Sequence, residues 1–127
     1  MDRIYVEPHR LREVWDFVRP GLLEVRQHSY DSWIPEDVYT DCFNGKAMLW
    51  LLVTDRPVGF GVVQPMGDTL HVWIGWGAWT MGEGFRHAKE IAKAGGAKKV
   101  SFESRRPGWE KLAKKHGFRP AKWIAEV

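Results

Sequence analysis

The sequence contains a single cysteine and no long apolar stretch, and each of these shortages excludes a class of protein. The lone Cys42 excludes a disulfide within the chain, so a reducing cytoplasm is the expected compartment. The longest apolar run, Ala47–Val53, has the length of a strand, whereas a membrane helix needs roughly 20 apolar residues. The first residues contain no apolar signal-peptide core. We therefore expect a cytoplasmic protein that does not contact a membrane.

Internal repeats, low-complexity segments and linkers are also missing from the sequence. The 127 residues suit one domain built around one hydrophobic core. Apolar residues make up 44% of the chain and charged residues 28%, as is typical of a globular protein. We therefore expect residues 1–127 to form a single domain.

The sequence does have eight tryptophans and an uneven division of charge. Residues 1–85 hold 7 Lys/Arg and 12 Asp/Glu, a net charge of −5, and residues 86–127 hold 12 and 4, a net charge of +8. A basic part joined to an acidic part indicates a polyanionic ligand on one side. The alternative is that the lysine-rich helix faces are simply solvated, and both interpretations stay open.

Apolar residues at helical spacing predict two helices in the first third of the chain. They recur every three to four residues between Leu11 and Leu22, which predicts an amphipathic helix. The Pro-Gly pair at 20–21 is expected to interrupt this helix, because proline has no N–H to donate. A second helix is expected to begin at Pro35 and to stop at the Asn-Gly pair at 44–45.

The pattern then changes to strands. Turn residues at 55–57 and 65–68 separate three apolar runs, which predicts an antiparallel meander. Its strands are expected at Ala47–Thr54, Val58–Gln64 and Thr69–Gly75. Further strands are expected at Ile4–Val6, Lys99–Ser104 and Pro120–Val127.

A glycine- and tryptophan-rich loop at 75–84 is expected to lead into a helix from Phe85, and another helix is expected to begin near Trp109. The unit from Thr69 to Ser104 then reads strand, loop, helix, strand, and such a unit forms a right-handed parallel crossover. The sequence therefore predicts an α/β fold, a mixed sheet with helices on both faces.

This order of elements resembles the GNAT superfamily of N-acetyltransferases over nearly the whole chain. The segments G-A-K-K-V (96–100) and G-W-E-K-L-A-K-K-H-G-F (108–118) are similar to its fifth strand and its fourth helix. The segments P-E-D-V-Y (35–39) and G-K-A-M-L-W (45–50) resemble short GNAT-like proteins of tailed phages and prophages. The resemblance implies the GNAT fold and transfer of an acetyl group from acetyl-CoA to an amine.

The resemblance also implies where acetyl-CoA would bind. The pantetheine arm would lie along the fourth strand, and the pyrophosphate would lie at the helix N-terminus that follows, where N–H groups and the helix dipole favour an anion. The alternative for the glycines of this segment is plain turn geometry. The implied cofactor-binding residues are Trp73, Ile74, Trp76, Gly82, Glu83, Gly84, Phe85, Arg86 and Arg106.

Three positions depart from the superfamily's pattern. Thr80 lies where the phosphate loop usually has Arg or Gln, and the segment is about three residues short. Arg106 replaces a frequent Asn, and Ala113 replaces the frequent catalytic Tyr, so tyrosine acid catalysis at that position is excluded. Beside this site, Trp73, Trp76 and Trp79 would either wall an apolar slot or pack against the sheet.

Two side chains are candidates for the general base that acetyl transfer to an amine requires. Glu103 is the first, because the resemblance implies that its strand splays from the fourth strand to admit the acetyl group. His71 on the fourth strand is the second. The alternatives are a surface glutamate paired with Lys98 or Arg105, and a histidine hydrogen-bonded in the core. No metal site is expected.

Three functions stay open on this evidence. The first is an N-acetyltransferase whose basic part neutralises the coenzyme's phosphates and whose acidic part attracts an amine of unknown identity. The second is a catalytically silent GNAT-fold phage or prophage protein that binds a protein partner. The third is nucleic-acid binding by the basic part. The acidic residues are Asp31, Glu36, Asp37 and Asp41, and the basic ones are Arg105, Arg106, Lys111, Lys114, Lys115, Arg119 and Lys122.

Overall fold

The computed structural model describes residues 1–29, 32–103, 109–120 and 125. Their order confirms the expected sequence of elements as far as the described residues reach, and the predicted last strand, Pro120–Val127, falls almost wholly outside them. The elements are β1 (Asp2–Val6), the 3-10 helix η1 (Pro8–Arg10), α1 (Leu11–Arg26), α2 (Pro35–Phe43), β2 (Met48–Val53), β3 (Pro57–Met66), β4 (Thr69–Gly77), α3 (Met81–Ala94), β5 (Lys99–Phe102) and α4 (Trp109–Lys115).

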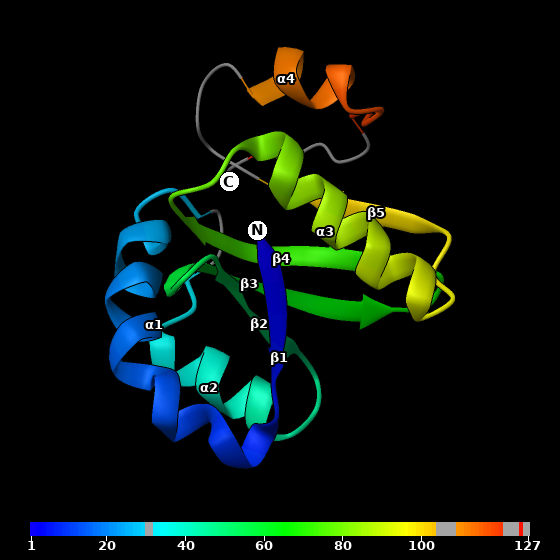
Figure 1. Cartoon of the computed structure of the whole chain (residues 1–127). Coiled ribbons are helices and arrows are strands. Elements are labelled where there is room, and N and C mark those ends of the chain that lie inside the picture. Colours follow the sequence, from blue (N-terminus) through cyan, green and yellow to red (C-terminus); the bar gives the residue numbers. More distant parts are fainter. Residues whose placement is uncertain (30–31, 104–108, 121–124, 126–127) are drawn as a thin grey trace.

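The five strands form one mixed sheet in the order β1-β2-β3-β4-β5 (Figure 1). The first four are antiparallel neighbours, and β5 returns through α3 to lie parallel to β4. The predicted mixed α/β fold with a parallel crossover is therefore confirmed. The strand expected at Ile4–Val6 is confirmed as β1, which begins at Asp2 and lies at the sheet edge with Asp2 opposite Val53 of β2.

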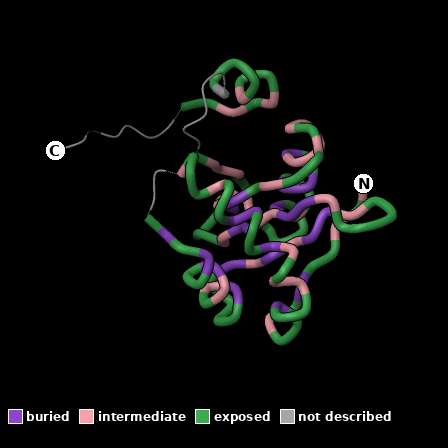
Figure 2. Tube along the Cα trace, turned by 90° about the vertical axis from the view of Figure 1, so that its left-hand side faces the viewer, coloured by how far each residue is buried: buried purple, intermediate pink, exposed green. Residues whose placement is uncertain are grey.

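The main core lies between the sheet and helices α1 and α2. Leu11, Val18 and Leu22 of α1 are fully buried, as are Phe60 and Val62 of β3, which they join in one cluster. Each such side chain contributes about 2 kcal/mol on burial. Figure 2 shows the buried residues gathered along the strands and the inner sides of the helices, whereas α4 has none. Among the described residues, no helix has the length and apolar character that crossing a membrane requires.

The prediction that the Pro-Gly pair at 20–21 interrupts the first helix is wrong. Helix α1 continues through Pro20, which lies on its exposed side. Gly21 is buried where the helix touches the sheet, and a Cβ there would lie 2.7 Å from atoms of both Phe60 and Trp76. Burial of Leu22 beyond the proline stabilises the last turns and offsets the missing hydrogen bond.

Strand β4 continues beyond its short ladder with β5, and this part of β4 positions the site. The parallel pairing ends with Val72 opposite Phe102, although β4 continues to Gly77. On its other side, β4 has a bulge against β3: Val72 and Ile74 have partners there, and Trp73 has none. A bulge leaves the backbone groups of its extra residue outside the ladder.

Candidate functional site

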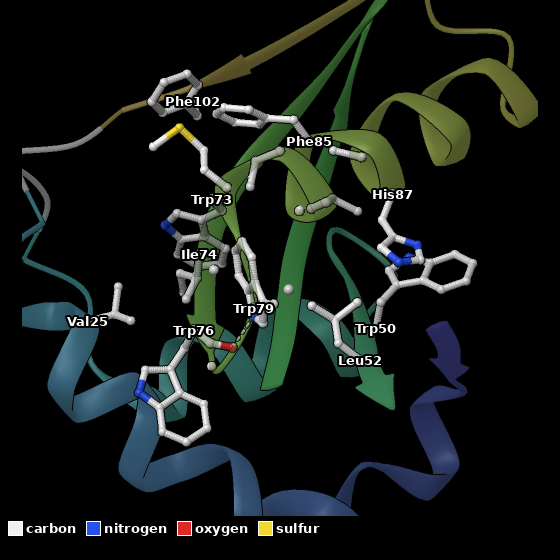
Figure 3. Close-up of a pocket in the computed structure, with 18 of the residues that line it drawn as sticks. Val25, Trp50, Leu52, Trp73, Ile74, Trp76, Trp79, Phe85, His87 and Phe102 are labelled. Carbon is white, nitrogen blue, oxygen red and sulfur yellow. Dashed lines mark hydrogen bonds between the residues drawn. The ribbon is translucent and has the colours of Figure 1, made fainter. Parts of the chain in front are cut away.

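A cavity of about 610 Å³ lies beside the part of β4 that continues beyond its ladder with β5, and it extends under α3 (Figure 3). Its size is typical of a site for a small molecule or cofactor. Most of the residues that the sequence singled out meet here. The cavity is lined by His71, Trp73, Ile74, Trp76, Trp79, Gly84, Phe85 and Glu103, among others.

The two candidate bases both face this cavity. His71 is half-buried on β4, and its Nδ1 lies 2.8 Å from the hydroxyl oxygen of Ser101, its neighbour on β5. Glu103 is exposed and directly follows β5. His71 is therefore fixed by a hydrogen bond, whereas Glu103 reaches the cavity from the solvent side. The structure brings together both alternatives that the sequence left open.

Two of the tryptophans are held by packing on the α1 side of the sheet. Trp73 makes an edge contact with Trp33, with ring centroids 6.0 Å apart. Trp76 stacks on Phe60 at 5.5 Å, and its Nε1 donates a hydrogen bond of 2.8 Å to Glu24. Both indoles are half-buried, so each one packs in the core with one part and lines the cavity with another.

Trp79 explains Gly84, one of the two glycines that were compared with a phosphate loop. Its indole lies against Gly84, where a Cβ would overlap the ring, and 3.2 Å from the position of a Cβ on Gly75. Its Nε1 donates a hydrogen bond of 3.0 Å to the carbonyl of Trp76. Gly84 is therefore required by the neighbouring indole, and Trp79 is held in place from both sides.

The expected loop at 75–84 is also corrected. Strand β4 extends to Gly77 and α3 begins at Met81, so Gly82 and Gly84 lie in the first helical turn. Thr80, the residue found in place of Arg or Gln, caps this helix: its hydroxyl accepts a hydrogen bond of 3.2 Å from the N–H of Glu83. A cap of this kind satisfies one first-turn N–H, and the helix N-terminus keeps its positive end toward the groove described next.

A second, smaller hollow of about 370 Å³ runs along the outer side of α3 from Gly82 to Lys93. Arg86 and Lys89 line it together with Lys93, against one carboxylate, Glu90. We call this hollow the cationic groove. Lys89 donates a hydrogen bond of 2.8 Å to the carbonyl of His116, which ties α3 to the segment after α4.

Phe85 lies between the cavity and the cationic groove and lines both. It is buried against Phe118, with ring centroids 4.4 Å apart, and against Phe102 at 5.2 Å. Phe118 of the Gly-Phe segment after α4 therefore packs against the ring that borders the cavity. The remaining predicted cofactor residue, Arg106, lies outside the described residues.

His87 is a buried polar residue that the sequence analysis did not single out. It lies on α3 and lines the cavity, with 4% of its surface exposed. Its Nδ1 is 2.9 Å from a guanidinium nitrogen of Arg3, and Arg86 approaches its other ring nitrogen at 3.2 Å. Burial, followed by the positive charges of Arg86 and Arg3, lowers the pKa of His87, so the folded protein favours neutral imidazole. No periodic pattern distinguishes such a residue in the sequence.

Two of the acidic residues that were expected to attract an amine, Glu36 and Asp37, make local contacts around α2. Asp37 accepts a hydrogen bond of 3.0 Å from the N–H of Ile34 and so caps α2, and Glu36 pairs with Arg19 at 3.2 Å. Asp31 lies outside the described residues. The carboxylates that line the cavity are instead those of Glu24 and Glu103.

Two further groups bear on chemistry. Cys42 is buried in the main core, and burial raises the pKa of its thiol to about 12, which makes it a poor nucleophile. In the described ranges, no three His, Cys, Asp or Glu side chains gather as a metal site would require.

The chain matches no known protein family and no curated protein. Solved structures do share its fold. A probable acetyltransferase superposes with a TM-score of 0.67 at 16% identity, over 100% of this chain and 96% of that one. A ribosomal-protein-alanine N-acetyltransferase from Brucella melitensis biovar Abortus 2308 gives 0.64 at 15%, over 100% and 98%. A predicted acetyltransferase with acetyl-CoA from Clostridium acetobutylicum gives 0.64 at 10%, over 99% and 94%.

Identities this low show the fold alone. The chain has the fold of the GNAT acetyltransferases, with its mixed sheet and its parallel β4-α3-β5 unit. Activity and ligand have to be argued from the site itself.

Proposed function

We propose that this protein is an N-acyltransferase that uses a coenzyme A thioester as donor and an amine as acceptor. The observation that carries the proposal is the junction at Phe85, where an apolar cavity beside β4 meets the cationic groove of α3. Coenzyme A has matching parts, since its thioester arm is weakly polar and its other end carries phosphates. A free amino acid or sugar would not match both the apolar cavity and the cationic groove.

The phosphates fit the α3 side of the junction. Arg86 and Lys89 supply positive charge, and the first turn of α3 adds its dipole and its remaining N–H groups. The thioester arm fits along β4 beyond Val72, where the ladder to β5 has ended and the strand can pair with a ligand. The Thr80 cap reduces the number of N–H donors for phosphate, so the cationic side chains carry more of the binding.

The chemistry needs one base and one polarised carbonyl. Glu103 accepts the proton that the acceptor ammonium must lose, either directly or through water. The free amine nitrogen then attacks the thioester carbon, the C–N bond forms, and the C–S bond breaks. The nitrogen gives up its second proton as it becomes an amide, and the coenzyme leaves as a thiolate that takes up this proton, directly or through water. We assign polarisation of the thioester carbonyl to backbone N–H groups at the Trp73 bulge, since Trp73 has no partner in the ladder to β3.

Coenzyme binding is the first test. Acetyl-CoA and free coenzyme A are expected to raise the melting temperature by mass action and to give a calorimetric Kd. Arg86→Ala is expected to weaken both about fivefold, because it removes one partly exposed cation from the groove. Arg56→Ala, the same change in the exposed turn between β2 and β3, is the matched control and should leave the Kd unchanged. No binding of coenzyme A at millimolar concentration would refute the proposal.

The second test distinguishes a residue that acts as the base from a residue that binds the coenzyme. With an acceptor found in a panel of amines, Glu103→Gln is expected to lower kcat about 100-fold and to leave the Kd of the coenzyme unchanged. His71→Gln should lower kcat much less, since the His71 ring already bonds Ser101. The reverse order of the two effects would assign the base to His71.

One observation favours the second candidate, a catalytically silent scaffold. Trp79 accounts for Gly84, and Thr80 replaces the usual loop side chain, so neither residue needs a coenzyme to explain it. A silent protein would act by binding a protein partner, in keeping with the resemblance to short phage and prophage proteins, which stays a prediction. Absence of coenzyme binding would support it. Steeply salt-dependent DNA binding through exposed Lys114, Lys115 and Arg119 would support the nucleic-acid alternative.

A further inference from the structure

The face of the sheet toward α3 has a bare patch at its centre. Gly59 and Gly61 of β3 lie opposite Gly77 and Gly75 of β4. The residues that alternate with them, such as Phe60, point into the main core on the other face, so these glycines face α3. We call the four residues the glycine floor.

Trp79 covers only part of this floor. A Cβ on Gly59, Gly75 or Gly77 would come within 3.2 Å of the Trp79 indole. A Cβ on Gly61 would meet a single described atom within 4 Å, the carbonyl oxygen of Ile74 at 3.8 Å. The cavity therefore continues above Gly61, past the edge of the indole.

The space above Gly61 is lined mostly by apolar groups, with the His87 ring beside them, and we call it the inner chamber. Leu52 and Trp50 of β2 form its far side, and Ala88 and Ile91 of α3 form its roof. In Figure 3, Trp79 lies between Trp73 on one side and the Trp50–Leu52 pair on the other. The chamber therefore lies on the other side of Trp79 from Trp73.

The far side of the inner chamber has one unsatisfied polar atom. The indole nitrogen of Trp50 is buried and has no hydrogen-bond partner among the described residues. Buried donors without acceptors are rare in folded proteins. No described residue supplies an acceptor for this N–H, and an alkyl chain would not supply one either.

We propose that the inner chamber receives the acyl chain of the donor thioester, and that this chain is much longer than acetyl. The inference rests on the proposed function, because it assigns the acyl group of the same donor. An acetyl group beside β4 just beyond its ladder with β5 would leave the chamber unused. From β4 across β3 to β2 is roughly 10 Å, about the extended length of an eight-carbon chain.

A thioester series tests the length of the chain. Coenzyme A and its acetyl, butyryl, hexanoyl, octanoyl and dodecanoyl thioesters are titrated into the native protein by calorimetry. Each buried methylene contributes up to about a fourfold gain in affinity, so octanoyl-CoA is expected to bind at least about tenfold more tightly than acetyl-CoA after chain-ordering costs. Dodecanoyl-CoA should gain nothing further, because it exceeds the chamber.

A side chain added to the glycine floor tests where the acyl chain binds. Gly61→Val puts three carbons into the chamber and suits a strand, and Gly61→Ala adds one. Octanoyl-CoA binding is expected to fall stepwise from the native protein through Ala to Val, by about tenfold in all, with acetyl-CoA unchanged. Gly95→Ala, at the end of α3 and outside the cavity, is the control and should change neither.

The outcomes separate this inference from the function on which it rests. Equal affinity for acetyl-CoA and octanoyl-CoA in the native protein overturns the chamber proposal and leaves the acyltransferase standing. So does a Gly61→Val protein that keeps its full preference for octanoyl-CoA. Failure of coenzyme A and of every thioester to bind refutes the proposed function itself. The thioester series needs no variant, so a poorly folding Gly61→Val protein does not remove the test.

Discussion

The two faces of the sheet are covered in different ways. Helices α1 and α2 pack on one face through large, fully buried side chains such as Leu22 and Phe60. Helix α3 lies over the other face, where the strands present glycines and a smaller buried cluster around Val63 and Leu70. Side chains alternate along a strand, so the same strands build both faces.

This difference teaches how a small protein can combine stability with room for a ligand. Close packing on the α1–α2 face supplies most of the buried apolar area that holds the fold together. The α3 face has glycines in place of larger side chains. The cavity lies on this face and beside the part of β4 that continues beyond its ladder with β5. If the division is real, equivalent substitutions on the two faces should have unequal effects.

The largest expected effect is loss of a core ring. Phe60→Ala removes a fully buried side chain from the α1–α2 face and should lower the free energy of unfolding by about 3–5 kcal/mol. Ile91→Ala on the α3 face borders an existing cavity and is half-buried, so it should cost less than about 2 kcal/mol. Urea denaturation measures both. Equal losses would show that the two faces are packed alike.

A smaller effect is expected where α3 meets Trp79. Glycine to alanine inside a helix ordinarily stabilises by about 0.5–1 kcal/mol. Gly84→Ala should instead destabilise by about 1–3 kcal/mol, because its Cβ would overlap the Trp79 ring. The same substitution in a Trp79→Ala background should recover the ordinary gain, and a double-mutant cycle by thermal denaturation measures the coupling. Independent effects would mean that Trp79 does not determine this glycine.

The pH dependence of stability should report on His87. Its pKa is lowered from 6.5, so the unfolded chain binds more protons than the folded protein between the lowered value and 6.5. The stability is therefore complete above pH 6.5 and falls as the pH decreases below it. Melting temperatures from about pH 8 to about pH 5 measure this. That range lies above 4.5, the ordinary pKa of Glu90, which Arg3 lowers further.

His87→Gln is the matched variant for this measurement, because it keeps a polar side chain and loses the titration. Its melting temperature should depend less on pH across the same range than that of the native protein. An unchanged pH dependence would assign the effect to other groups.

The smallest expected effect compares two indole nitrogens. Trp33 donates a hydrogen bond of 3.0 Å to Ser29 on the α1 side, whereas the buried Trp50 nitrogen has no described partner on the α3 side. Trp33→Phe should cost about 1 kcal/mol more than Trp50→Phe, because only the former breaks a hydrogen bond. Thermal denaturation of the two variants decides this. A larger loss for Trp50→Phe would show that its N–H has an acceptor.

Much of the fold followed from local patterns. Apolar runs between turn residues located β2, β3 and β4, and helical spacing located α1. The continuity of α1 through Pro20 did not follow, because burial of Gly21 and Leu22 against the sheet outweighs the local cost of proline. The length of β4 and the start of α3 were also missed, since Gly75 and Gly77 indicate a loop when their strand partners are unknown.

The candidate site was predictable only in part. His71 and Glu103 could be chosen because few strand residues in the sequence can act as bases, and the structure lines one cavity with both. His87 could not be chosen, because its environment is made by Arg3, which is 84 residues away in the sequence. The sequence showed an excess of positive charge in residues 86–127. Only the structure shows that Arg86, Lys89 and Lys93 of α3 line one groove.

The sequence by itself determined the order of the elements, the mixed sheet with its parallel crossover, and a basic C-terminal part, because periodicity, turn residues and charge are local properties. Only the tertiary structure decided what the glycines are for. Gly84 accommodates the indole of Trp79, and Gly61 leaves open space under α3. The sequence shows only that a glycine has no side chain. Whether other atoms fill the space beside it depends on elements that only folding brings together.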